Sequence, residues 1–187
     1  MITLGMWQNL ARMGACYAEL GFQDLPQPWV ASHEATHATL PSGVLPCELN
    51  GQILVGSAEQ AFIDRMLTHQ MPQGRWQATT PCFRNEPVLD ALHKPYFIKL
   101  ELIHYMPSMA DAELETMILQ VRWVLGTLIP DGGPTIKIEP TDIGWDLTLH
   151  GQEIGSYGIR EYAGHRWIYG TGIAEPRFTT IVCQNTD

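Results

Sequence analysis

Arg84 and Glu86 lie two residues apart in the stretch PCFRNEP. On a β-strand, residues at that spacing point to the same face of the sheet. An arginine and a glutamate side by side could bind an anion and the polar edge of a nucleobase together. The same pair is also typical of an ordinary surface ion pair, so the stretch gains meaning only from its neighbours.

Two carboxylates, Asp146 and Glu153, flank the turn at His150 and Gly151 in WDLTLHGQEIGSYGIR. A hairpin would place both side chains in one cleft. Carboxylates that share a cleft with arginines are typical ligands of a Mg²⁺ ion that bridges a polyphosphate.

The stretch YGTGIAEPR contains glycines at 170 and 172, followed by Arg177. Glycines permit close backbone packing, and the segment 174–182 is predicted to be a helix with Pro176 in its first turn and Arg177 one turn into it. A G-x-G pattern alone is weak. The three charged stretches in this order point to one phosphate-binding site.

The stretch HEATH, residues 33–37, is a literal H-E-x-x-H, the pattern of zinc hydrolases. Pro28 and Pro41 confine any helix here to about Ser32–Leu40, and no later segment offers an obvious third ligand. The sequence therefore does not favour zinc, and His33 and His37 are predicted to lie in a polar loop.

These residues must be positioned by a fold whose periodicities predict one helix, mostly antiparallel strands, further helices between them and one last helix. Ser108 and Asp111 form a capping box at the start of one helix. The order predicts an α+β fold with a central antiparallel sheet flanked by helices. The expected helices are 3–20, 58–71, 107–129 and 174–182, and the expected strands are 51–57, 74–86, 96–106, 135–139, 145–150, 153–159 and 167–172.

The bulk properties favour an acidic, single-domain protein. The chain has 187 residues, a net charge of −9 and a pI near 5.1, which is poor for a stand-alone nucleic-acid binder. Its four cysteines show no C-x-x-C spacing and are expected to be reduced and intracellular. No apolar run approaches the roughly 18 residues of a membrane span, so we expect a cytoplasmic protein without membrane contact.

Taken together, the stretches resemble the catalytic domain of class II aminoacyl-tRNA synthetases. The nearest likeness is to the aspartate, asparagine and lysine enzymes and to ammonia-dependent asparagine synthetase. The first helix with GFQDLPQPWV resembles family motif 1, CFRNEP…HKPYFIKLEL resembles motif 2, and YGTGIAEPR resembles motif 3. The likeness spans 1–187 as one catalytic domain, and we expect no anticodon-binding domain.

The resemblance implies a nucleotide site. Arg84 would bind the α-phosphate of ATP, and Glu86 would lie at the adenine edge. Phe97 would stack under the adenine, with Arg177 over it and reaching towards the γ-phosphate. The acidic strand pair, Asp146 and Glu153, would hold Mg²⁺.

The resemblance also implies an amino-acid site. The acidic residue that meets the substrate ammonium would be Glu34, with Glu59 as a second. The segment EIGSYGIR would bring Ser156 and Arg160 to the amino acid, and Arg160 favours an acidic substrate. The reaction would yield an aminoacyl-adenylate and pyrophosphate.

Three positions depart from the family pattern. Phe62 stands where the aspartyl enzymes carry a lysine, so part of the aspartate side-chain site is missing. Leu92 stands where the lysyl enzymes carry a phosphate-binding arginine, although His93 or Lys94 could replace it. Tyr96 replaces a common glutamate.

The resemblance leads us to expect an ATP-dependent, amino-acid-activating ligase that forms a homodimer through motif 1. With a net charge of −9, we do not expect tRNA as a partner, and the acceptor would be ammonia, a small amine, a carrier protein or a protein side chain. Two alternatives stay open: a catalytically silent paralogue that senses amino acid or nucleotide, and a tRNA-charging enzyme with a separate subunit.

Overall fold

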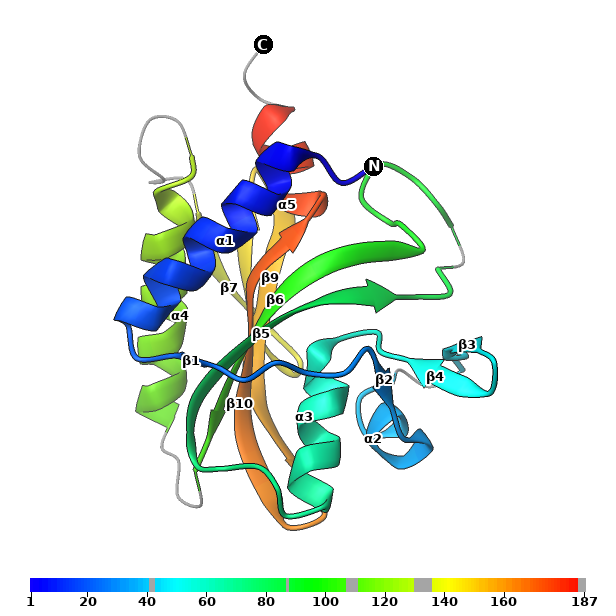
Figure 1. The fold of residues 1–187 in the computed structure, drawn as a ribbon. Helices are drawn as coiled ribbons and strands as arrows, with labels where there is room; N and C mark the ends of the chain where they lie inside the picture. Colours follow the sequence, from blue (N-terminus) through cyan, green and yellow to red (C-terminus); the bar gives the residue numbers. More distant parts are fainter. Residues whose placement is uncertain (41–42, 87, 107–110, 130–135, 185–187) are drawn as a thin grey trace.

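A seven-stranded sheet forms the centre of the computed structural model, which describes the chain except residues 41–42, 87, 107–110, 130–135 and 185–187 (Figure 1). Neighbouring strands are antiparallel, apart from the two-residue edge strand β1, which is parallel to β5. In spatial order the strands are β1 (Gln23–Asp24), β5 (Gly74–Phe83), β6 (Tyr96–Tyr105), β10 (His165–Glu175), β9 (Gln152–Tyr162), β8 (Gly144–Leu149) and β7 (Lys137–Thr141).

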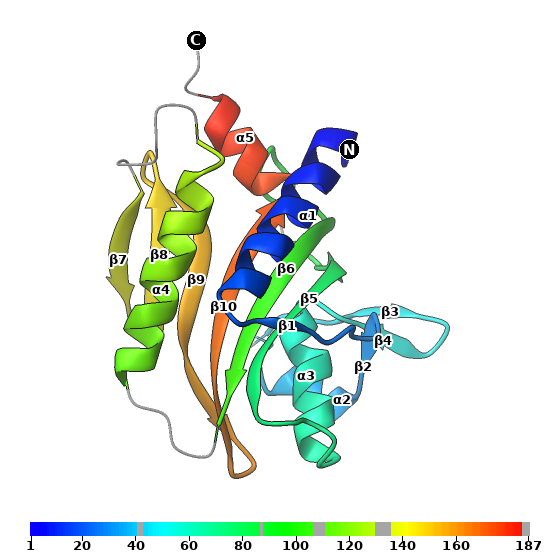
Figure 2. The ribbon, with the colours of Figure 1, turned by 60° about the vertical axis from the view of Figure 1, so that its left-hand side comes forward.

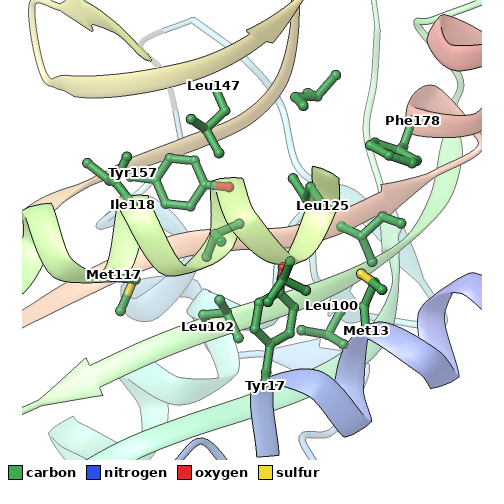
Figure 3. Packing of buried hydrophobic residues seen from close by; sticks show 14 of the residues in the cluster. Met13, Tyr17, Leu100, Leu102, Met117, Ile118, Leu125, Leu147, Tyr157 and Phe178 are labelled. Carbon is green, nitrogen blue, oxygen red and sulfur yellow. The ribbon is translucent and has the colours of Figure 1, made fainter. Parts of the chain in front are cut away.

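Helices α1 (Leu4–Glu19) and α4 (Asp111–Gly126) cover one face of this sheet (Figures 1 and 2). The Thr3 side chain caps α1 by accepting a hydrogen bond from the Met6 amide at 3.4 Å. The expected capping residue of α4, Ser108, lies outside the described residues. Figure 3 shows the resulting core, in which side chains from α1, α4 and the strands interdigitate with Phe178 of α5 (Arg177–Cys183).

Glycines in β10 permit this close packing. A Cβ atom on Gly172 would lie 2.4 Å from Leu100 Cδ2 and 2.9 Å from Tyr17 Cε2, both distances too short for real atoms. Instead, the Tyr17 hydroxyl donates a 2.7 Å hydrogen bond to the Gly172 carbonyl. The expected role of the G-x-G glycines in backbone packing is confirmed, and they face the helical layer rather than a ligand.

The opposite face of the sheet carries a smaller layer. Helix α3 (Ala58–Leu67) packs through Phe62 against Trp167 and neighbouring residues. Beside α3 lie the five-residue helix α2 (His33–His37) and a second sheet (Figure 2). That second sheet has the strand order β2 (Val30–Ala31), β4 (Gln52–Leu54) and β3 (Cys47–Leu49). The sequence predicted only one strand here, because strands of two or three residues show no readable alternation.

Two predicted boundaries are wrong in ways that affect the site. Strand β5 ends at Phe83, so Arg84 and Glu86 lie in a loop rather than on a strand. The chain leaves the strand there because the Asn85 side chain donates 3.0 Å hydrogen bonds to the Leu45 and Pro46 carbonyls of the smaller layer. Likewise, Arg177 is the first residue of α5 and not one turn inside it.

Among the described residues, no helix has the length and apolar character to cross a membrane.

Candidate functional site

A cavity of about 600 Å³ opens on the sheet face opposite α1 and α4. Its floor is formed by β6, β9 and β10, and its walls by α3, the smaller layer and the loop after β5. The cavity brings together most of the residues that the sequence singled out: Glu59, Arg84, Glu86, Phe97, Glu153, Ser156, Arg160 and Arg177.

The outer end of the cavity contains Arg84 and Phe97. The guanidinium carbon of Arg84 lies 5.0 Å from the centre of the Phe97 ring, and its Nε donates to the Gly56 carbonyl at 3.4 Å. A cation over an aromatic face is a favourable contact. The resemblance placed Arg177 above this ring, with an adenine between them, whereas the structure places Arg84 there. Among the described residues, Arg84 forms no ion pair.

Arg177 lies instead beside Glu153, with Nη1 3.3 Å from Oε1. Both side chains are partly exposed, at 25% and 44%. The start of α5 and the strand β9 bring them together, although they are separated by 24 positions in the sequence. The pair is therefore open to exchange with a bound anion or cation.

Asp146 lies next to this pair without lining the cavity itself. It sits opposite Ser156 in the β8–β9 ladder, where a register shift follows Leu147. Burial and, to a smaller extent, the negative charge of Glu153 raise the pKa of the Asp146 carboxyl, and a hydrogen bond with Ser156 opposes the rise. The two predicted carboxylates are therefore close enough to interact.

The carboxylates of Asp146 and Glu153 fit the role that the resemblance implies for them, which is to hold Mg²⁺ on ATP. No group of three or more His, Cys, Asp or Glu side chains that could hold a metal occurs in the described part of the chain. Mg²⁺ is commonly bound by one or two carboxylates, with phosphate oxygens and water as its other ligands. Asp146 and Glu153 match that arrangement. Two carboxylates would be too few for a metal site built from protein ligands alone.

Glu59 is buried at the inner end of the cavity, with 3% of its surface exposed. Its Oε1 accepts a 2.7 Å hydrogen bond from the Trp167 indole, and its Oε2 accepts one from Arg160. Burial raises the pKa of the Glu59 carboxyl, and Arg160 and Trp167 both oppose that rise. The Arg160 guanidinium also lies 4.0 Å from the centre of the Tyr169 ring. The carboxylate and guanidinium thus neutralise one another.

A second ion pair lies on the cavity floor, and sequence reasoning missed it. Lys99, which lines the cavity, places its ammonium 2.9 Å from Glu101, whose side chain is fully buried. Ser57 donates a hydrogen bond to the same carboxylate. The signal was present in the sequence, because Phe97, Lys99 and Glu101 alternate on one strand and must share a face.

Two hydroxyl groups on cavity-lining residues are poorly satisfied: Thr36 Oγ1 has no hydrogen-bond partner among the described residues, and Tyr169 Oη has only a long contact with the Ser156 side chain. Thr36 is 1% exposed and Tyr169 is 4% exposed. Buried polar groups are normally satisfied, and those that are not often mark a place where a ligand binds.

Glu34 lies outside this cavity, so its predicted contact with the substrate ammonium is not supported by the geometry. It is exposed, and the Tyr162 hydroxyl donates to it over 3.5 Å. Ser32 caps α2 by accepting from the Ala35 amide, which starts the helix, and positions 34 and 36 then lie about 200° apart around it. Thr36 therefore faces the cavity while Glu34 faces away.

The HEATH stretch is the helix α2 rather than the predicted polar loop. The rings of His33 and His37 stack with centres 3.9 Å apart, and His37 Nδ1 lies 2.9 Å from the His33 carbonyl. Both histidines are exposed on a helix of five residues. Stacked rings with one nitrogen already directed at the backbone are not the arrangement of two ligands on a shared metal.

No protein-family model and no curated protein matches the sequence. Solved structures do match the fold. Two structures of pyrrolysyl-tRNA synthetase from Desulfitobacterium hafniense each superpose with a TM-score of 0.71 and 16% sequence identity. The match covers 94% of this chain and 68% of each of theirs. At this identity the likeness shows the fold, which is that of a class II synthetase catalytic domain, as the sequence predicted. The nearer likeness to the aspartyl, asparaginyl and lysyl enzymes stays a prediction.

Proposed function

We propose that the protein is an ATP-dependent ligase that activates an amino acid as its aminoacyl-adenylate. The observation that carries this proposal is the division of one cavity into two ends. The outer end has Arg84 beside an aromatic ring and the exchangeable pair of Arg177 and Glu153. The inner end has the buried carboxylate of Glu59 paired with Arg160.

The outer end suits a nucleotide triphosphate. Arg84 is a cation without a carboxylate partner among the described residues, and Lys94 on the same loop is another. Phe97 offers a flat face for a base once Arg84 turns to the phosphates. Glu86 lines the same end and supplies an acceptor for an amino group on the base.

The proposed reaction asks the protein for alignment rather than covalent chemistry. An oxygen of the amino-acid carboxylate forms a bond to the α-phosphorus, and the bond to pyrophosphate breaks. Arg84 is positioned to hold the α-phosphate and to neutralise the charge that develops there. Arg177 would leave Glu153 to bind the outer phosphates. Mg²⁺, held by Asp146 and Glu153, would neutralise phosphate charge when bound.

The acceptor is proposed to be ammonia, a small amine, a carrier protein or a protein side chain rather than tRNA. The net charge of −9 opposes a polyanion. Val88 and Leu89, in the loop that also carries Arg84 and Lys94, are 67% and 61% exposed, so part of the loop presents apolar side chains that would not bind a phosphate backbone.

A silent paralogue that only binds a nucleotide or amino acid is the second candidate. It is favoured by one observation: Arg84 already covers Phe97 and Arg177 is already paired, so both predicted phosphate ligands are engaged within the protein.

Exchange of labelled pyrophosphate into ATP separates the two candidates. Purified protein with Mg²⁺, ATP and the correct amino acid should show exchange that depends on that amino acid. Binding of ATP by calorimetry without exchange for any amino acid would support the sensor and overturn the ligase.

A further inference from the structure

We propose that the inner end of the cavity selects an amino acid whose side chain is uncharged and carries a hydrogen-bonding group, such as a carboxamide or hydroxyl. This inference rests on the proposed function and names its substrate class. It replaces the acidic substrate that the resemblance suggested through Arg160.

Each cation at the inner end already has a carboxylate of its own. Arg160 is paired with Glu59, and Lys99 with Glu101. The cations that line the cavity without an ion pair among the described residues, Arg84 and Lys94, belong to the outer end. The inner end therefore has no net positive charge to offer an acidic side chain.

An acidic side chain would have to displace Glu59 from Arg160. Glu59 is 3% exposed and is also held by the Trp167 indole, so it has no solvent to turn into. Displacement would leave one buried carboxylate without its cation, which is strongly unfavourable.

A basic side chain on the substrate would find no carboxylate of the described residues free to pair with it at the inner end. Both oxygens of Glu59 already accept hydrogen bonds. Glu101 Oε1 has no hydrogen-bond partner among the described residues, but Glu101 is paired with Lys99, is fully buried and does not line the cavity. A third cation at this end would face two ion pairs that are already neutral.

A neutral polar side chain satisfies what the cavity leaves unsatisfied. Thr36 Oγ1 comes from α2 and has no partner among the described residues, and Tyr169 Oη comes from β10 and has only a long contact with the Ser156 side chain. A hydroxyl both donates and accepts, so it can pair with either end of a carboxamide or with another hydroxyl. The Arg160 stack over Tyr169 fixes the ring that carries one of them.

The test uses isosteric pairs of amino acids and a direct binding measurement. Calorimetry with the wild-type protein and ATP compares asparagine with aspartate, glutamine with glutamate and threonine with valine, with lysine added. We expect the tightest ligand to be an uncharged polar amino acid, bound about tenfold or more tightly than its charged or apolar isostere. Tightest binding of aspartate, glutamate or lysine would overturn the inference, and so would the absence of any measurable binding.

The same panel in pyrophosphate exchange separates this inference from the proposed function. Selective binding without exchange would leave the substrate class standing and remove the ligase. Exchange driven best by an acidic amino acid would leave the ligase standing and remove the substrate class.

Two variants test the residues that carry the inference. Glu59→Gln removes the charge that neutralises Arg160, so we expect the preference to move at least tenfold towards the acidic isostere. Glu161→Gln is the matched control, since Glu161 is exposed, adjacent to Arg160 in sequence and not part of the cavity. An unchanged preference in a folded Glu59→Gln protein would overturn the charge argument.

Tyr169→Phe keeps the ring and removes only the hydroxyl, whose one contact within the protein is a long one to Ser156, so the variant should fold even where Glu59→Gln does not. We expect the best uncharged ligand to bind about 3–10-fold more weakly, as for the loss of one neutral hydrogen bond. Its apolar isostere should bind unchanged. Equal losses for both ligands would show that Tyr169 acts through shape alone, which contradicts the proposal.

Discussion

Arg84 is the residue on which the proposed chemistry depends most. It is exposed and makes one hydrogen bond to a backbone carbonyl, so its removal affects little packing. We expect Arg84→Ala to reduce pyrophosphate exchange by about 10²–10³-fold, the usual loss for one preorganised donor to a developing charge. Far-UV circular dichroism should be unchanged.

The matched control is Arg122→Ala, because Arg122 lies on α4 behind the sheet and does not line the cavity. Equal activity in the two variants would show that Arg84 is not a phosphate ligand.

The reactivity of the Cys82 thiol reports how well strand β5 is shielded from solvent. Burial raises the pKa of its thiol to about 11, so at pH 8 only about one thiol in a thousand would be ionised. Because the thiolate is the reactive form, iodoacetamide should leave Cys82 unmodified in the folded protein at pH 8 and modify it in urea. Cys47, at the cavity wall and partly exposed, should be modified before Cys82. Peptide mass spectrometry measures both sites, and early labelling of Cys82 would mean that the strand opens to solvent.

Individual site residues were predictable to different extents. Arg177 and Phe97 could be identified as cavity residues because motifs fix their position along the chain, although Arg177 lies beside Glu153 rather than over the Phe97 ring. Lys99 was predictable from strand alternation but was overlooked. Thr36 and Tyr169 could not be identified from the sequence, because the hydrogen bonds of a hydroxyl depend on the neighbours that the fold places around it. The pairing of Glu59 with Arg160 spans 101 positions and is invisible to any local pattern.

At the scale of elements, the contact of α1 with β10 depends on one position without a side chain. Gly172→Ala would place a methyl group against Leu100 and Tyr17, and overpacking of this kind costs about 1–3 kcal/mol. The expected result is a lower free energy of unfolding in urea.

Gly5→Ala provides the opposite control. Gly5 is exposed in the first turn of α1, and the nearest atom to its added Cβ lies 3.9 Å away. Alanine in place of glycine in a helix should stabilise by about 0.5–1 kcal/mol. A loss of stability in both variants would contradict the packing account of Gly172.

Element prediction succeeded where hydrophobic periodicity was long. Helix α1 and the strands β5 and β6 follow patterns of ten residues or more, and the structure confirms them within a few positions. It failed for β2 and β3, which have two and three residues and are held by pairing with β4. It also misplaced the end of β5, because the Asn85 side chain bonds to a layer that is distant in sequence.

At the scale of the whole molecule, α1 leaves apolar surface uncovered. Leu4 is 75% exposed and Trp7 is 48% exposed, and a groove with Ala11 and Ala15 runs beside them. We expect a homodimer formed through this helix, as motif 1 of the resembled family implies. Trp7→Glu should convert it to a monomer in light scattering at about 10 µM.

Trp123→Glu is the control for this prediction, since Trp123 on α4 is 67% exposed as well. Dissociation of the Trp123 variant alone would place the interface on α4. A monomeric wild-type protein would remove the expectation of a dimer altogether.

The acidic balance of the chain sets an expectation for tRNA. With a net charge of −9, repulsion from phosphates should prevent binding of bulk tRNA below about 10 µM at physiological salt. Filter binding measures this directly. Retention at submicromolar concentration would favour the tRNA-charging alternative.

The ion pair of Glu59 and Arg160 has a consequence for the history of the protein. Its two members come from α3 and β9, so one nucleotide change in a codon can alter the charge of the pocket without touching the other element. A lineage that changed substrate should therefore keep arginine at position 160 and differ at position 59, which should be charged where the substrate is neutral and uncharged where the substrate is acidic. Homologous genes that keep arginine at position 160 would record in codon 59 whether an ancestor used a neutral or an acidic amino acid.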